Sequence, residues 1–118
     1  MPPKESTIYK MLEIVQYLVN ALVKEKDKAS VELHENFIII TVAPEDMGSI
    51  IGRNGRVAKA IRTIARGLLP SGGVRYTIDI LNQEERAEIE ANGGLANYKG
   101  GKKAGNSDVV TSDENEQE

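Results

Sequence analysis

Two glycines that bracket two polar residues, Gly52-Arg53-Asn54-Gly55, form the stretch of this sequence best suited to binding chemistry. An apolar pair, Ile50-Ile51, precedes the stretch, and helix-forming residues follow it. Glycines adopt backbone angles barred to other residues, and they leave no side chain between the backbone and a ligand. A helix that begins after such a turn points N–H groups at an anion. The stretch therefore predicts a phosphate-binding turn, although two glycines often serve only to join two helices.

The charge around this turn favours the binding interpretation. The formal net charge is −3, but the charges are unevenly distributed along the chain. From Ser107 to the end there are five acidic residues and no basic one. From Met47 to Arg75 there is no acidic residue and there are six basic ones, which are Arg53, Arg56, Lys59, Arg62, Arg66 and Arg75. The middle of the chain is thus expected to present an anion-binding surface, unless the basic run is only a solvated helix face.

Other kinds of chemistry find little support in the composition. The chain has no cysteine, which excludes disulfides and thiolate metal sites and suits a reducing cytosol. No apolar run approaches the roughly 18 residues of a membrane span, and the first ten residues lack the apolar core of a signal peptide. The single histidine, His34, is expected at the surface, and no nucleophile lies in a pattern with a base. We therefore expect a cytoplasmic protein without membrane association, enzymatic activity, cofactor or metal.

The apolar periodicity predicts an α+β domain. Apolar residues at spacings of three and four predict a helix over Ile8–Lys24, capped by Ser6 or Thr7. The other predicted elements are strands at Ser30–His34 and Phe37–Ala43, a short helix at Glu45–Ile51, a helix at Gly55–Leu68 and a strand at Val74–Leu81. This order indicates a three-stranded sheet with helices packed on one face.

The helix after the glycine turn is predicted to have two distinct faces. Its apolar face should pack on the sheet and contains Val57, Ala60, Ile61, Ile64 and Leu68. Its opposite face should contact water and contains Arg56, Lys59, Thr63 and Arg66.

The composition changes after Leu81. Residues 82–91 are predicted to form a polar helix, with Asn82 and Glu85 as a capping box. Residues 92–118 are rich in Gly, Lys, Asn, Ser and acids, and they are predicted to be a disordered acidic tail. The chain is thus divided into an N-terminal extension at 1–7, a single domain at 8–81, the polar helix and the tail.

A family resemblance sharpens these expectations. The string "IIGRNGR" resembles the GXXG signature of the KH domain. The order helix-strand-strand-helix-GXXG-helix-strand resembles the bacterial, type II form of that fold. The longer string "VAPEDMGSIIGRNGRVAKAIRTIAR", at Val42–Arg66, resembles the small single-domain KH proteins of bacteria, the KhpA (YlqC) family. The resemblance covers about residues 8–81.

The resemblance implies a site for single-stranded RNA. A KH domain clamps the backbone of about four nucleotides with its GXXG loop, and the bases lie in an apolar groove between the two helices and the strand that follows them. The segment "LLPSGGV" falls where type II domains carry a variable loop. Either Ile50 or Ile51 would bound the groove while the other joins the core. The candidate RNA-binding residues are Ile51, Gly52, Arg53, Asn54, Gly55, Arg56, Lys59 and Arg62.

The resemblance also implies protein partners. Members of this family are associated with a homodimer, or with a heterodimer that includes a larger KH protein of the KhpB (Jag/EloR) kind. They are also associated with RNA regulation or chaperoning in cell elongation and division. Two candidate interfaces are the first helix and the region of Ile64, Ala65 and Leu68, unless these residues are simply core. The alternative function is accordingly a dimerisation module or scaffold in which RNA binding is secondary. The acidic tail would either compete with RNA or serve only as a solubilising extension.

Overall fold

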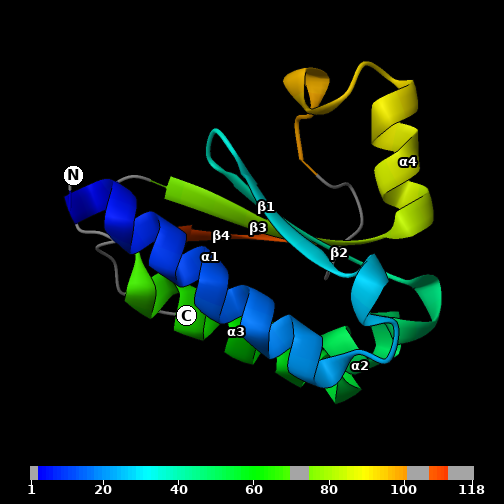
Figure 1. Cartoon of the computed structure of the whole chain (residues 1–118), viewed down its shortest axis with the longest axis horizontal. Helices are drawn as coiled ribbons and strands as arrows, with labels where there is room; N and C mark the ends of the chain where they lie inside the picture. Colours follow the sequence, from blue (N-terminus) through cyan, green and yellow to red (C-terminus); the bar gives the residue numbers. More distant parts are fainter. Residues whose placement is uncertain (1–2, 70–74, 101–106, 112–118) are drawn as a thin grey trace.

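A computed structural model describes residues 3–69, 75–100 and 107–111 (Figure 1). The helices are α1 (Pro3–Leu22), α2 (Met47–Ile51), α3 (Arg56–Leu68) and α4 (Gln83–Ala91). The strands are β1 (Ser30–His34), β2 (Phe37–Val42), β3 (Arg75–Asn82) and β4 (Ser107–Thr111), and single 3-10 turns are η1 (Lys26–Lys28), η2 (Pro44–Asp46), η3 (Arg53–Gly55) and η4 (Leu95–Asn97). The order α1-β1-β2-α2-α3-β3 confirms the α+β arrangement expected from the sequence.

The described strands form one sheet in the order β1-β2-β3-β4. A two-residue turn joins β1 to β2, which run antiparallel and pair His34 with Phe37 beside the turn. β2 and β3 run parallel because α2 and α3 carry the chain back between them, and this pairing sets Ile38 opposite Ile78. β2 is therefore the central strand of the predicted three-stranded sheet.

The fourth strand was not predicted. β4 runs antiparallel to β3, and its register sets Thr111 opposite Arg75. These residues fall inside the tail that is predicted to be disordered, because their surroundings are polar and acidic. The short run Val109-Val110-Thr111 has strand-forming residues, and the outer edge of β3 offers unpaired backbone groups to such a run. Residues 101–106 and 112–118 lie outside the described part, so disorder there stays a prediction.

Side chains alternate between the two faces of the sheet, which we call the front face and the back face. The front face carries Ile38, Ile40, Ile78 and Ile80, all 0% exposed, and joins the main core. α1 and α3 cover this face and contribute the buried Met11, Val15, Val19, Ala58, Ile61 and Ala65. The back face carries Phe37, Ile39 and Thr41 of β2 and Thr77, Asp79 and Leu81 of β3. α4 lies on that side, away from α1 and α3 (Figure 1).

Two expectations about the helices were wrong in detail. α1 begins at Pro3 rather than Ile8, so Thr7 lies inside the helix and does not cap it. Proline favours a first helical position because its missing N–H would have no partner there. α3 buries a narrower stripe than predicted, since Ala60 is exposed and Ile64 is 41% exposed. The small buried side chains of Ala58 and Ala65 flank Ile61 instead, and they let the helix lie close to the sheet.

Candidate nucleic-acid interface

A buried carboxylate positions the helix that leads into the glycine turn. Asp46, which is 1% exposed, lies at the start of α2. Its two oxygens accept hydrogen bonds from the backbone N–H of Lys24 at 3.1 Å and of Glu25 at 3.0 Å. These N–H groups, Glu25 first and Lys24 second, hold the pKa of Asp46 below its ordinary value of 3.8. The end of α1 is thereby tied to the start of α2.

Sequence reasoning missed this role of Asp46. Glu45 and Asp46 stand at the start of the predicted short helix, where negative charge is favourable for local reasons alone. The actual donors lie more than 20 positions earlier in the chain, where no local pattern points to them. The only signal was an acid on a short helix immediately after a buried strand.

Gly52 ends α2 and is required at that position for two reasons. Its φ of 78° lies in the region that favours glycine, and its N–H donates to the Gly48 carbonyl at 2.8 Å. A Cβ at Gly52 would lie 2.4 Å from Cγ2 of Val57 and 2.8 Å from the backbone N of the same residue. The first glycine therefore lets α2 and α3 meet closely.

The second half of the turn leaves the start of α3 open. Asn54 (φ 57°) and Gly55 (φ 73°) both adopt left-handed backbone angles, which asparagine tolerates better than most residues. No heavy atom lies within 4 Å of a Cβ built on Gly55, so this backbone borders open space. No side chain caps α3 at Gly55. The N–H of Arg56 donates to the Arg53 carbonyl, so only the N–H groups that follow it in the first turn of α3 can be left for water or a ligand.

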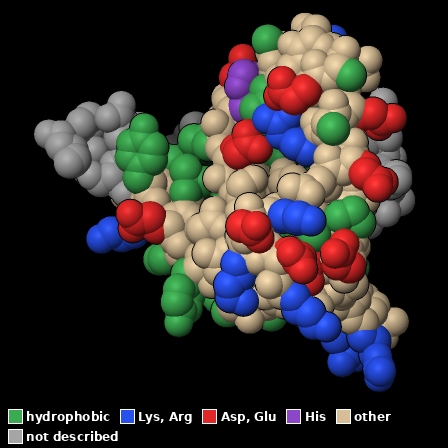
Figure 2. Space-filling view, turned by 45° about the vertical axis from the view of Figure 1, so that its right-hand side comes forward, with side chains coloured by type: hydrophobic (Ala, Val, Ile, Leu, Met, Phe, Trp, Pro, Cys, Tyr) green, Lys and Arg blue, Asp and Glu red, His purple; other side chains and the backbone are tan. Residues whose placement is uncertain are grey.

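The basic side chains surround this open helix start. Arg53, Asn54, Arg56 and Lys59 are exposed. Lys59 follows Arg56 by one helical turn on the same side of α3, as the sequence predicted. Figure 2 shows Lys and Arg side chains gathered at the lower right tip of the molecule, at the end where Figure 1 places α2. The loop thus combines backbone donors, a helix N-terminus and full positive charges.

The remaining predicted site residues lie in two different settings. Ile50 is fully buried in the core, whereas Ile51 is half-buried and packs against the core from outside, beside Val57. Of the two, only Ile51 is exposed enough to contact a ligand. Arg62 is half-buried on the flank of α3 rather than on the exposed face with Arg56 and Lys59. The structure therefore brings Ile51–Arg56 and Lys59 together and sets Arg62 somewhat apart.

The charge and open backbone of this loop suit a phosphodiester backbone. In the part of the chain that the structure describes, no three His, Cys, Asp or Glu side chains gather into a group that could hold a metal ion. None of the described helices is long and apolar enough to cross a membrane. The chemistry on offer is electrostatic and hydrogen-bonding attraction for phosphate, with an apolar surface beside it.

The fold and the site together define the class of the protein. A sheet with a parallel β2-β3 pair, connected by α2, a GXXG loop and α3, is the type II KH fold. The family described as "KhpA/KhpB, KH domain" matches residues 12–80. This match covers more than half of the sequence, and the chain therefore belongs to the KhpA/KhpB KH-domain family.

Curated relatives agree with this assignment. A protein of Caldanaerobacter subterraneus subsp. tengcongensis named "RNA-binding protein KhpA" is 39% identical over 75 residues, which are 60% of this chain and 100% of the relative. A protein of the same name from Clostridium perfringens is 36% identical over 75 residues, with the same two shares. One from Mycobacterium bovis is 30% identical over 79 residues, which are 64% of this chain and 95% of the relative. No solved structure gives a significant match.

The C-terminal extension lies beyond the matched family region. α4, η4 and β4 all follow residue 80, where the family match ends. The relatives are matched over nearly their whole length, but they cover less than two thirds of this chain. The elements after β3 are therefore additions to the family's common domain.

Proposed function

We propose that this protein binds single-stranded RNA through the loop Gly52–Gly55 and catalyses no reaction. The observation that carries the proposal is the open backbone at Gly55, directly before α3, with the exposed Arg53 and Arg56 on either side of it in the sequence. The names of the relatives, each an RNA-binding protein, support the same ligand.

The residues of the site are expected to make different kinds of contact with RNA. Gly52 and Gly55 let an RNA backbone approach the loop, while Arg53, Asn54 and Arg56 supply charge and hydrogen-bond donors to phosphate. The exposed edge of Ile51 offers apolar contact to a base, and Lys59 extends the positive surface along α3. Because most of these contacts address the backbone, we expect low sequence specificity.

The experiment that tests the proposal reverses charge on the loop. Arg53→Asp with Asn54→Asp should weaken binding of a fluorescent single-stranded RNA about tenfold or more, which is about 1.4 kcal/mol. A matched control, Lys10→Asp with Asn36→Asp, makes the same change in net charge at exposed positions of α1 and of the β1–β2 turn. The control should bind like the wild type. Unchanged binding by a correctly folded loop variant would refute the assignment.

The salt dependence of binding tests the same site independently. For single strands the slope of log affinity against log salt is about −0.7 per neutralised phosphate, and a KH loop clamps about four nucleotides. We therefore expect a wild-type slope of about −3 and a shallower slope for the loop variant. Binding that does not respond to salt would contradict the phosphate contacts.

We extend the proposal to a role in the cell. By resemblance to its family, the protein would act as a post-transcriptional regulator or RNA chaperone linked to cell elongation and division. Crosslinking followed by RNA sequencing, with the wild type and the loop variant expressed equally, would identify its targets. Targets recovered equally well by both proteins would contradict a role for the loop.

A second candidate function rests on exposed apolar side chains. Tyr9 and Tyr17 of α1 are 63% and 73% exposed, and Ile64 of α3 is 41% exposed. The neighbours Ala65 and Leu68 are buried and half-buried, so they contribute mainly to the core. These exposed residues favour a protein interface, either in a homodimer or with a KhpB-like KH protein. Association that survives nuclease and the loop variant, but not Tyr17→Ser with Ile64→Ser, would support the scaffold function.

A further inference from the structure

The outer edge of β3 is occupied by the chain's own C-terminal segment. Thr77 donates its N–H to the Asn36 carbonyl at 2.9 Å, on the side of β2. Successive backbone N–H groups of a strand point to opposite sides. Tyr76 and Ile78 therefore present theirs on the other side, where the register sets them opposite Val110 and Asp108 of β4.

This edge adjoins the proposed RNA site. The resemblance to KH domains implies that the bases lie between the two helices and the strand that follows them, which is β3. One edge of β3 is covered by β2, so only the outer edge is left to face a base. β4 pairs with that edge and also contacts α3. An RNA strand that runs from the loop along α3 and β3 would meet β4 there.

The charge of the segment makes it a competitor for RNA rather than an extra contact. From Ser107 to the end of the chain there are five acidic residues and no basic one. α3, which β4 contacts, carries basic residues along its length, and the basic Arg75 at the start of β3 lies opposite Thr111. Of the acidic residues, Asp108 lies within β4 opposite Ile78, and negative charge there repels phosphate.

The extension is anchored close to its target. Tyr98 donates its hydroxyl to the buried Asp79 of β3, and its ring lies edge-on to Phe37 with 5.0 Å between the centroids. Eight residues separate this anchor from the start of β4. A short tether gives a segment a high effective concentration at its own site, so even weak strand pairing can hold it there.

We propose that β4 is an autoinhibitory strand, which occupies the base-facing edge of β3 and must leave before RNA can fill the groove. The inference rests on the proposed function, since it assigns a regulation to the same site. Any RNA or protein that displaces β4 would raise the affinity of the loop for RNA. If β4 is seated in about nine of ten molecules, its release raises the apparent affinity about tenfold.

Two proline variants of the full chain test this proposal. Val110→Pro removes a backbone donor that faces β3, whereas Val109→Pro removes one that faces away and can be tolerated at a sheet edge. Val110→Pro should raise RNA affinity about tenfold and speed hydrogen exchange at the Tyr76 and Ile78 amides. Val109→Pro should leave both close to wild type. A chain that ends at Gly100 should bind as tightly as Val110→Pro, which checks the result without a proline.

The outcomes separate the two proposals. If all these proteins bind RNA equally and Arg53→Asp with Asn54→Asp still abolishes binding, the autoinhibitory strand is refuted and the RNA site stands. Rapid exchange of the Tyr76 and Ile78 amides in the wild type would also refute it. If the loop substitutions have no effect in the Gly100 chain, the proposed function fails and the inference fails with it.

Discussion

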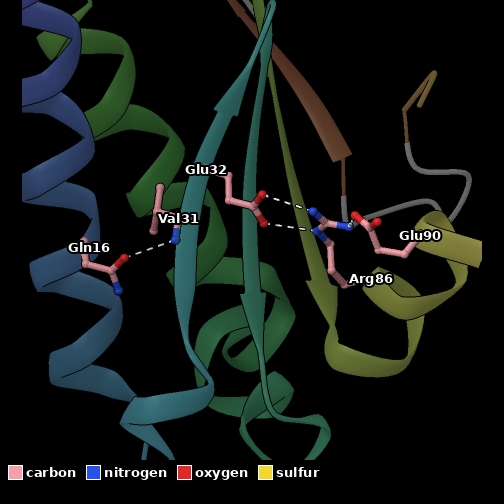
Figure 3. A network of polar contacts seen from close by, with 5 residues as sticks. All are labelled: Gln16, Val31, Glu32, Arg86 and Glu90. Atoms are coloured by element: carbon pink, nitrogen blue, oxygen red, sulfur yellow. Dashed lines mark hydrogen bonds and ion pairs between the residues drawn. The ribbon is translucent and has the colours of Figure 1, made fainter. Parts of the chain in front are cut away.

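The two faces of the sheet are covered in different ways. The front face carries the buried Ile38, Ile40, Ile78 and Ile80, and α1 and α3 cover it with side chains that are almost fully buried. The back face is more mixed, because it carries Thr41 and Asp79 beside Ile39 and Leu81, and the C-terminal extension contacts it through directed polar contacts as well as apolar packing. Figure 3 shows one of the polar contacts, in which Arg86 of α4 contacts Glu32 of β1 through two nitrogens, each 3.1 Å from a carboxylate oxygen. Arg86 also contacts Glu90 of its own helix at 2.7 Å.

This difference suggests that the front-face core is fixed, whereas the C-terminal extension can detach from the rest of the domain. Burial of apolar surface is cooperative and close-packed, so the front face cannot open without unfolding the domain. A few hydrogen bonds and ion pairs can break one at a time at modest cost. The family-matched residues build the front face, and the extension beyond them attaches to the back face and to the edge of β3.

The largest expected effect comes from neighbouring residues of β2 on opposite faces. Ile39 and Ile40 are both 0% exposed, but only Ile40 belongs to the main core. Ile40→Ala should cost about 2–5 kcal/mol of unfolding free energy. Ile39→Ala should cost less, because the short α4 can close onto the gap. Chemical denaturation measures the unfolding free energy of both variants. An equal or larger loss for Ile39→Ala would show that the back face is packed as tightly as the front face.

The two glycines of the turn should respond differently to substitution by alanine, because Gly52 is closely packed and Gly55 borders open space. Gly52→Ala places a methyl group against Val57 at a positive φ and should cost about 2–4 kcal/mol. Gly55→Ala meets only the backbone penalty, about 1 kcal/mol, since its surroundings are empty. Thermal melts of both variants measure the difference. Equal losses would show that α2 and α3 do not meet closely at Gly52.

The anchor of the extension should have a smaller effect. Tyr98→Phe removes the hydroxyl that Asp79 accepts and should cost about 1–3 kcal/mol. Burial and, next, the bond to Asp79 raise the pKa of Tyr98 above its ordinary value of 10. Above pH 10 the unfolded chain therefore releases this proton more readily, and wild-type stability should fall as pH rises. The Tyr98→Phe variant has no hydroxyl to titrate, so it should lose less stability above pH 10 than the wild type. Identical dependence of stability on pH in both proteins would contradict the Tyr98–Asp79 hydrogen bond.

The smallest effects belong to the surface of α4. Arg86→Ala, which loses both acidic partners, should cost about 1 kcal/mol. Glu90→Ala removes only an exposed contact within the helix and should cost less than about 0.5 kcal/mol. The carboxylates hold the pKa of Arg86 above its ordinary value, so its charge is constant throughout the neutral range. Urea titrations measure the unfolding free energy of both variants. A larger loss of stability for Glu90→Ala than for Arg86→Ala would show that the Arg86–Glu32 contact does not hold α4 on the sheet.

Local patterns predicted most of the domain. β1 was predicted at its observed bounds, and the capping box at Asn82 and Glu85 was confirmed, because both features depend on neighbours in the sequence. The GXXG loop was likewise recognisable from two glycines and the charge around them. The assignment of its residues to RNA stays a prediction.

What the sequence could not predict depends on contacts between distant segments. The bonds of Asp46 to the end of α1, the contact of Tyr98 with Asp79 and the pairing of β4 with β3 each join residues that no periodicity links. The orientation of α3 was also misjudged, since small alanines rather than Ile64 face the sheet. The periodicity of the sequence identifies an apolar stripe on α3, but it does not show which edge of that stripe packs against the sheet.

The central claim is that RNA contacts the loop between α2 and α3. Titration of the isotope-labelled chain with a short single-stranded RNA, followed by amide NMR shifts, tests it most directly. We expect the largest shifts at Gly52–Arg56 and Lys59, with small shifts at the exposed Tyr9 and Tyr17 of α1. Shifts confined to α1, or an unperturbed loop at saturating RNA, would contradict it.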